Sequence, residues 1–203
     1  MKKFLVKAKK PIVILGLLVA PFLLNSLLKS NHKAPISINL LKKVDGIYVH
    51  QCKGFMSDDL VITASHCFRG DDEEYIPLYI HSGAKYYEVM RPFYVGKYTG
   101  LKGSDIALSG KFSSELIGEC QDYGYTENYL NMCNLTPNGD GSAYYSDNCI
   151  YPKGMSGTVL VNKNQKACLV YSGFYDIIDK NKNSIKKIGV FKPLKGIKNE
   201  YVD

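Results

Sequence analysis

Residues 151–161 read Tyr-Pro-Lys-Gly-Met-Ser-Gly-Thr-Val-Leu-Val and place Ser156 between two glycines, ahead of an apolar β-branched run. This pattern predicts a tight turn that leads into a strand. The glycine at 154 permits a bend in which the N–H groups of Gly154 and Ser156 converge on one point, the arrangement that an oxyanion hole requires. Taken alone, the stretch fits an ordinary turn serine better than a nucleophile.

Two earlier stretches supply the partners that a nucleophilic serine needs. Residues 61–67, Val-Ile-Thr-Ala-Ser-His-Cys, form an apolar run that ends at His66. Residues 103–108, Gly-Ser-Asp-Ile-Ala-Leu, place Asp105 at the start of another apolar run. An acyl-transfer serine requires a base that takes its proton and a carboxylate that orients this base. The candidate catalytic residues are therefore His66, Asp105 and Ser156, each at the edge of a predicted strand.

These three motifs together resemble the trypsin/chymotrypsin-like serine protease family over residues 44–202. T-A-S-H-C is similar to the family's T-A-A-H-C, S-D-I-A-L to its D-I-A-L, and G-M-S-G to its G-D-S-G, in the same order along the chain. The resemblance implies an all-β fold of two six-stranded antiparallel barrels with the site in the cleft between them. It also implies a serine endopeptidase that acts through an acyl-enzyme, with the N–H groups of Gly154 and Ser156 as its oxyanion hole and with no cofactor or metal.

The sequence departs from the family pattern next to the nucleophile. Met155 replaces the aspartate that pairs with a newly cut N-terminus in the digestive members, which makes the chain more similar to bacterial members such as glutamyl endopeptidases. By offset from Ser156, the resemblance implies a first specificity pocket lined by Ile150, Tyr151, Tyr171, Ser172 and Gly173. An apolar residue at the pocket base would leave an arginine or lysine side chain unpaired, so we expect a non-basic preference, for apolar or small side chains.

The N-terminus has the features of a membrane-targeting segment. Residues 1–10 contain five lysines, and residues 11–28 are apolar apart from Asn25 and Ser26. An uncleaved signal anchor is favoured over a cleaved signal peptide, since no good cleavage site follows. The lysines before the segment predict that the rest of the chain is translocated, as an anchored domain facing the periplasm or exterior, or as a secreted one. Residues 29–43 are expected to be a linker.

The excess of positive charge in the chain comes from this N-terminal part. Nine of the 26 basic residues and none of the 19 acidic residues lie in residues 1–43, which leaves the remainder with a net charge of −2. The body therefore has no basic excess of the kind that indicates nucleic-acid binding, and the expected partners are a polypeptide substrate and, through the N-terminal segment, a membrane. The acidic run 71–74 is interpreted as a solvated loop rather than a calcium site, because consecutive acids point in different directions.

All the cysteines lie after residue 43, and their even number in a translocated domain indicates disulfides. No C-x-x-C pair is present, so the spacing does not indicate a zinc site. The resemblance implies a Cys52–Cys67 bridge. Three pairings remain open for the other four cysteines, of which Cys133–Cys149 with Cys120–Cys168 is favoured.

The body reads as an all-β protein. Short runs rich in tyrosine, valine and isoleucine alternate with glycine, asparagine and aspartate. They lie at 46–52, 60–64, 76–80, 86–94, 106–108, 120–125, 129–135, 143–145, 158–161, 167–171 and 187–191, with a clear hairpin turn at 136–142. The protease domain is expected over 44–203, with the first barrel at about 44–112 and the second at about 113–203.

Three other functions compete with a protease: an idle relative, an esterase, and an anchored structural domain that uses its tyrosines as a binding face, although strands commonly use tyrosines for packing. The first is a catalytically idle relative that binds a peptide or protein partner in the cleft. The second is an esterase of the α/β-hydrolase type, which expects the order Ser, Asp, His and alternating helices, neither of which this chain shows.

Overall fold

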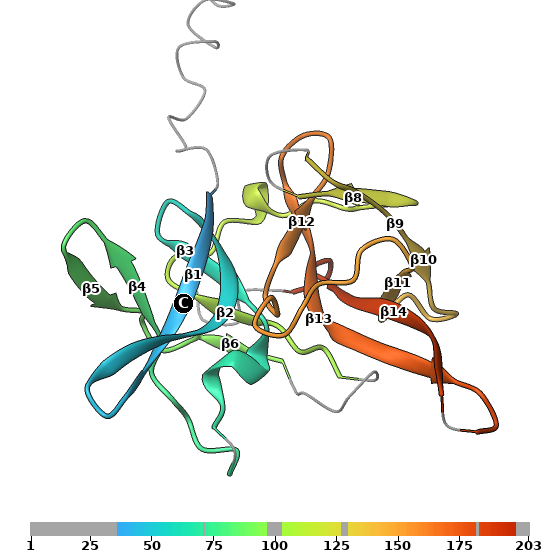
Figure 1. Cartoon of the computed structure of the whole chain (residues 1–203). Helices are drawn as coiled ribbons and strands as arrows, with labels where there is room; N and C mark the ends of the chain where they lie inside the picture. The colour runs from blue at the N-terminus through green and yellow to red at the C-terminus, as the bar shows by residue number, and fades with distance from the viewer. Residues whose placement is uncertain (1–35, 71, 97–102, 127–129, 182, 198–203) are drawn as a thin grey trace, which may run out of the picture. The chain divides into compact units, whose positions relative to one another are not determined.

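The structure is a computed structural model, and it describes residues 36–70, 72–96, 103–126, 130–181 and 183–197. These residues form fourteen strands and two short 3₁₀ helices, η1 (Ser65–Phe68) and η2 (Ser114–Leu116), and no α-helix is found among them (Figure 1). The predicted all-β class is confirmed.

The first half of the described chain builds one antiparallel sheet of seven strands, in the order β5-β4-β1-β2-β3-β7-β6. Its longest part is a hairpin in which Val44 pairs with Ile47 across a two-residue Asp45-Gly46 turn, where both residues have positive φ. Such a turn matches the twist of the flanking strands. The strand bounds are β1 (Ile36–Val44), β2 (Ile47–Ser57), β3 (Leu60–Thr63), β4 (Tyr79–Ser82), β5 (Lys85–Glu88), β6 (Tyr94–Val95) and β7 (Ala107–Ser109).

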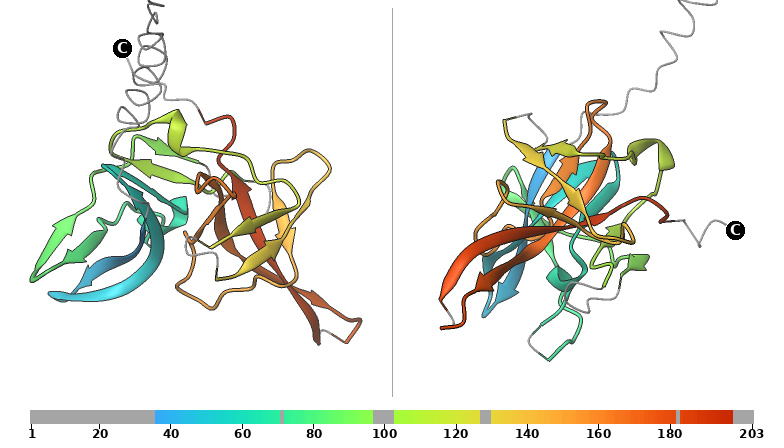
Figure 2. Two further views of the ribbon diagram at one scale, coloured as in Figure 1. Left: turned by 90° about the horizontal axis from the view of Figure 1, so that it is seen from above. Right: turned by 90° about the vertical axis from the view of Figure 1, so that its right-hand side faces the viewer.

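The second half builds another antiparallel sheet of seven strands, in the order β10-β11-β14-β13-β12-β8-β9. It is dominated by the long β13–β14 hairpin, drawn in orange and red in Figure 2. The strand bounds are β8 (Tyr123–Tyr125), β9 (Met132–Asn134), β10 (Thr136–Pro137), β11 (Tyr144–Ser146), β12 (Val159–Val161), β13 (Ala167–Ile178) and β14 (Ser184–Pro193).

The two sheets share a hydrophobic core along β12 and the start of β13. Val159 and Val161 of β12 and Val170 of β13 pack in the same buried cluster as Phe55 of β2 and Ile62 of β3. Every residue of β3 and of β12 is buried. His66 follows β3, Asp105 precedes β7 and Ser156 precedes β12, so each candidate catalytic residue lies next to a fully buried strand.

Three disulfides reinforce this arrangement. They join Cys52 to Cys67 within the first sheet region, and Cys120 to Cys168 and Cys133 to Cys149 within the second. These are the same pairs that the sequence analysis favours.

The structure also differs from the expectations in its details. Each sheet has seven strands where the resemblance implies six, although the arrangement is consistent with a two-barrel chymotrypsin fold. The expected linker 29–43 is wrong in its C-terminal part, because β1 starts at Ile36 and its Ile38 and Leu40 pack inward against β2. The hairpin expected at 136–142 is confirmed by the pairing of β10 with β11.

The expected division at 112–113 falls between β7 and β8. The basic region and the anchor predicted at 1–28 lie outside the described residues. Within the described part of the chain, no helix has the length and apolar character needed to span a bilayer.

Candidate functional site

Two neighbouring strands bring His66 and Asp105 into direct contact. His66 lies in η1, shortly after β3, and Asp105 lies just before β7. β3 pairs with β7, and Thr63 stands opposite Ala107 at the end of this pairing. His66 Nδ1 is 2.9 Å from Asp105 Oδ2 and 3.1 Å from Oδ1. Since an ionised carboxylate only accepts, Nδ1 is the donor, and the Nε2 nitrogen of a neutral His66 carries the lone pair.

The Asp105 carboxylate is fully buried and accepts hydrogen bonds from three residues. Besides the ring of His66, the donors are the backbone N–H of His66 at 3.0 Å, Ser65 Oγ at 2.9 Å and Ser172 Oγ. Burial alone raises the pKa of Asp105. The hydrogen bonds and charge of His66, together with Ser172, outweigh burial and hold this pKa below its ordinary value. Asp105 is therefore an ionised carboxylate at neutral pH.

The loop that carries Ser156 is tied to both sheets. The carbonyl of Ser156 accepts from the N–H of Lys53 in β2 at 2.8 Å, and the N–H of Gly157 donates to the carbonyl of Tyr171 in β13 at 2.8 Å. Inside the loop, Met155 N–H donates to Pro152 O and Thr158 Oγ1 donates to Met155 O. These bonds fix the backbone on either side of the serine.

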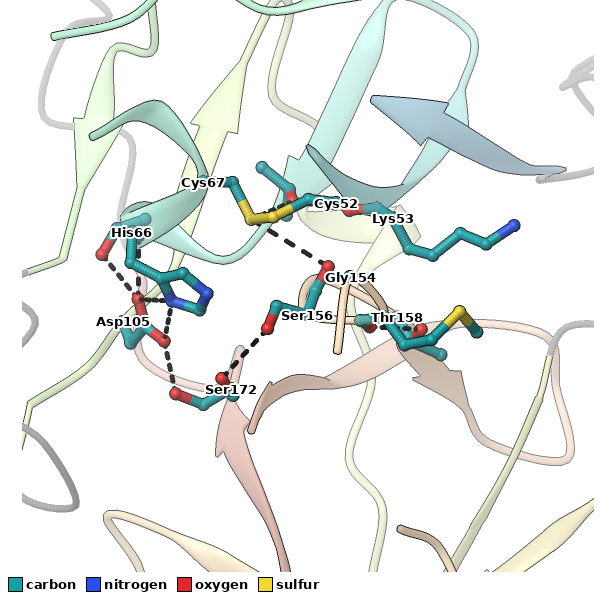
Figure 3. Close-up of a disulfide and its surroundings, with 12 residues drawn as sticks. Cys52, Lys53, His66, Cys67, Asp105, Gly154, Ser156, Thr158 and Ser172 are labelled. Atoms are coloured by element: carbon teal, nitrogen blue, oxygen red, sulfur yellow. Dashed lines mark hydrogen bonds and ion pairs between the residues drawn. A yellow bond between two sulfur atoms is a disulfide. The ribbon is translucent and has the colours of Figure 1, made fainter. Parts of the chain in front are cut away.

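Ser156 belongs to the same hydrogen-bonded cluster as His66 and Asp105. Its hydroxyl donates to the carbonyl of Ser172 at 3.4 Å, and the Ser172 hydroxyl in turn donates to Asp105. In Figure 3 the imidazole of His66 lies between the Asp105 carboxylate and the Ser156 hydroxyl. The His66 side chain is 28% exposed, so solvent reaches it while Asp105 stays covered.

Two backbone N–H groups of the serine loop are uncommitted within the described residues. The N–H groups of Gly154 and Ser156 donate to no protein acceptor there, whereas that of Met155 between them does. Gly154 has a φ of +88°, a conformation that glycine adopts readily. Its carbonyl lies 2.8 Å from Nε2 of His50, and this hydrogen bond helps to fix the orientation of the Gly154–Met155 peptide.

Two of the residues expected to line the first specificity pocket, Tyr151 and Tyr171, are in contact with each other. Tyr171 is 1% exposed, and its hydroxyl bonds to the backbone of Tyr151. Burial raises the pKa of Tyr151 to about 12, and burial also raises the pKa of Tyr171. Ile150, Ser172 and Gly173 are partly buried, and the Ser172 hydroxyl is directed to Asp105 (Figure 3).

Two residues, Ser172 and His50, contribute to the site in ways that the sequence does not predict. Ser172 was expected to line the pocket but donates to Asp105, and His50, in a strand-like run, contacts the loop before Ser156. The only signal for Ser172 is its place at the end of an apolar run, which does not show where its hydroxyl points. His50 lies two residues before Cys52, whose predicted bridge to Cys67 brings that strand towards the site.

One cluster of metal-ligating types occurs among the described residues, Cys52, His66 and Cys67. The two sulfur atoms are bonded to each other, so neither is a thiolate that binds a metal. In the acidic loop, Arg69 pairs with Glu73 at 3.4 Å.

Comparison with known proteins found no matching family model and no matching curated protein. Among solved structures, the chain is similar to catalytically active tobacco etch virus protease complexed with product, with 13% identity and a TM-score of 0.47, over 78% of this chain and 72% of that one. It is also similar to a Glu endopeptidase in complex with MPD, with 13% identity and a TM-score of 0.46, over 81% of this chain and 85% of that one.

Proposed function

We propose that this chain is a serine endopeptidase of the trypsin/chymotrypsin-like type, with Ser156 as nucleophile, His66 as general base and Asp105 as the orienting carboxylate. The observation that carries the proposal is the buried, ionised Asp105 bonded to Nδ1 of His66, with Ser156 joined to the same cluster through Ser172. A base oriented by a carboxylate next to a serine is the arrangement that activates a hydroxyl for acyl transfer.

In the proposed reaction, Ser156 Oγ attacks the carbonyl carbon of a peptide bond and its proton passes to Nε2 of His66. The protonated imidazole then gives this proton to the leaving amine as the C–N bond breaks, which leaves an acyl-enzyme. Water repeats the sequence with His66 again as base, releasing the acid and restoring the hydroxyl. Asp105 stays ionised throughout and stabilises the imidazolium.

The attack requires the Ser156 hydroxyl to turn from the Ser172 carbonyl towards His66. Without substrate, catalytic hydrogen bonds are commonly long or misaligned, so this rotation is a normal part of the reaction. The negative oxygen of the tetrahedral intermediate would be stabilised by the uncommitted N–H groups of Gly154 and Ser156.

The proposed substrate is a polypeptide whose residue before the scissile bond is not basic. Ile150, at the expected pocket base, offers no charge to a lysine or arginine side chain. We also propose that the domain works outside the cytoplasm, held there by the predicted anchor at 11–28. The three disulfides support an oxidising compartment. Detection of the full-length protein in the membrane fraction would test the anchor.

The proposal is tested by incubating the purified protein with unfolded casein and following peptide release. The wild type should cleave casein, Ser156→Ala should not, and Ser82→Ala, a change of an exposed serine in β4, should cleave at the wild-type rate. Equal cleavage by Ser156→Ala would exclude this serine as the nucleophile. Binding of peptides by a wild type that cuts none of them would favour the idle, peptide-binding alternative.

A further inference from the structure

If the proposed protease function holds, the space between two segments beside Ser156 determines which substrate side chains can stand before the scissile bond. The first segment is 150–151, before the serine loop, and the second is 171–173, in β13. These are the expected walls of the first specificity pocket, so whatever lies between them sets how large a side chain can enter.

The Tyr171 side chain bridges these two walls. Its hydroxyl donates to the carbonyl of Tyr151 at 3.1 Å and accepts from the N–H of Tyr151 at 3.2 Å. Both polar groups of one backbone residue are therefore satisfied by the same phenol. Moving the ring aside would leave this partly buried N–H and C=O without their protein partner, which is unfavourable.

Two more aromatic rings pack around Tyr171. The ring of Tyr151 meets it edge-on with centroids 4.9 Å apart, and the ring of Phe191 in β14 lies 5.2 Å away. Tyr171 and Phe191 are 1% and 0% exposed. Their hydrophobic cluster also contains the Cys133–Cys149 and Cys120–Cys168 disulfides, which join separate parts of the second sheet around these rings.

The backbone of β14, the strand that carries Phe191, approaches the chain just before the first segment. A Cβ placed on Gly189 of β14 would overlap the carbonyl oxygen of Cys149, so the strand and the segment before Ile150 are in direct contact. At this point β14 and the chain before Ile150 therefore leave no space between them.

From these contacts we infer that Tyr171 fills the first specificity pocket and restricts the enzyme to substrates with a small residue, glycine, alanine or serine, before the scissile bond. A larger side chain would have to displace a packed ring, and overpacking of a dense interior is strongly disfavoured. Tyr171 is thus a specificity-determining residue: it excludes large side chains by occupying the space they would need.

The first experiment uses the wild type alone. A library of peptides from a digested proteome is incubated with the protein, and the residue before each cut is read by mass spectrometry. Glycine, alanine and serine should precede the cuts, with leucine, phenylalanine and arginine depleted by about 100-fold, since even one methylene that a pocket cannot hold costs 10- to 200-fold. Cuts after leucine or phenylalanine as frequent as those after alanine would overturn the inference.

The second experiment changes the ring and its hydroxyl separately. Tyr171→Val removes the ring and should raise cleavage after leucine and phenylalanine at least about tenfold relative to alanine. Tyr171→Phe keeps the ring and should retain the preference for small residues. Rates are expressed per active site titrated with a fluorophosphonate. An unchanged preference in a folded Tyr171→Val would overturn the inference. If this variant does not fold, the cleavage profile of the wild type on the peptide library tests the inference instead.

The fluorophosphonate titration separates the two proposals. If the wild type is labelled at Ser156 but cuts after large residues, only the role of Tyr171 fails. If the wild type is neither labelled nor cuts any peptide, the protease function fails and the inference falls with it.

Discussion

Asp105 is the residue on which most hydrogen bonds of the site converge. It has a φ of +34°, in a region that non-glycine residues seldom occupy, and its carboxylate is completely buried. Residues held in such conformations tend to cluster at active sites, where the surrounding structure compensates for the strain. Here the compensation comes from Ser65, His66 and Ser172, which all donate to the same carboxylate.

Replacing this carboxylate by an amide should remove most of the activity. In Asp105→Asn, the amide nitrogen cannot accept from Nδ1 of His66, so the imidazole loses the tautomer that the reaction needs. We expect the rate of casein cleavage to fall by about 10,000-fold, the size of the effect for this change in a serine protease triad. Asp122→Asn, at an exposed position, should cleave normally. A less than tenfold loss in Asp105→Asn would contradict the assigned role.

Asp105 should also make the stability of the fold dependent on pH. Its pKa is lower in the folded protein than the ordinary value of about 4, so its ionised form stabilises the fold above that pH. This stabilisation is lost as the pH falls through the lower, folded-state pKa. Urea unfolding should therefore show Asp105→Asn clearly less stable than the wild type at pH 7, with a smaller difference at pH 3. The same difference at both values would argue against an ionised Asp105.

Residue types and their order are sufficient to propose His66, Asp105 and Ser156, because each stands next to an apolar run, His66 after it and the other two before it. The role of Ser172 could not be predicted, since a contact between its hydroxyl and Asp105, 67 residues away, depends on how the two sheets meet. The same holds for Tyr171, expected as a pocket wall, whose hydroxyl bonds across to Tyr151.

The serine loop packs closely against β2 and β3 at Gly157. Gly157 has a φ of +86°, and a Cβ there would overlap the carbonyl oxygen of Lys53 in β2 and the hydroxyl of Thr63 in β3. The loop is therefore pressed against the first sheet at the residue after the nucleophile, and only glycine fits.

Gly157→Ala should consequently cost about 3 kcal/mol of unfolding free energy, from the positive φ and from overpacking together. Gly46→Ala is the matched control, because Gly46 has nearly the same φ, +83°, with no atom within 4 Å of the added Cβ. It should cost only about 1 kcal/mol. Urea unfolding of the two variants measures the difference, and equal losses would show that the approach to Lys53 is not tight.

Short apolar runs separated by turn residues predict most strands but not β1. The lysines and small polar residues of 29–43 predict a linker, yet Ile38 and Leu40 face the core. The Asp45-Gly46 pair is a hairpin signal that implies a strand on both sides. The pairing of β1 with β2 therefore makes residues 36–44 a strand in spite of their polar composition.

For the whole molecule, the disulfides differ in the length of chain that they close. Cys120 and Cys168 are 48 residues apart, whereas the other two bridges join residues 15 and 16 apart. A bridge that closes a longer loop removes more entropy from the unfolded chain.

Replacing each pair by alanines should rank the bridges accordingly. Loss of Cys120–Cys168 should cost about 4 kcal/mol of unfolding free energy, and loss of either short bridge about 3 kcal/mol. Urea unfolding of the three double variants at pH 7 measures the order. If loss of Cys120–Cys168 proves the least destabilising, loop entropy does not govern the contribution of these bridges.

The two sheets, each with its own disulfides and sharing the core at β12, position side chains that are far apart in sequence around one serine. The most direct test is to treat the protein with a fluorophosphonate and locate the adduct by tandem mass spectrometry. A single adduct on Ser156, lost in His66→Ala, is the predicted result. No adduct, an adduct on another residue, or equal labelling of the His66→Ala variant would contradict it.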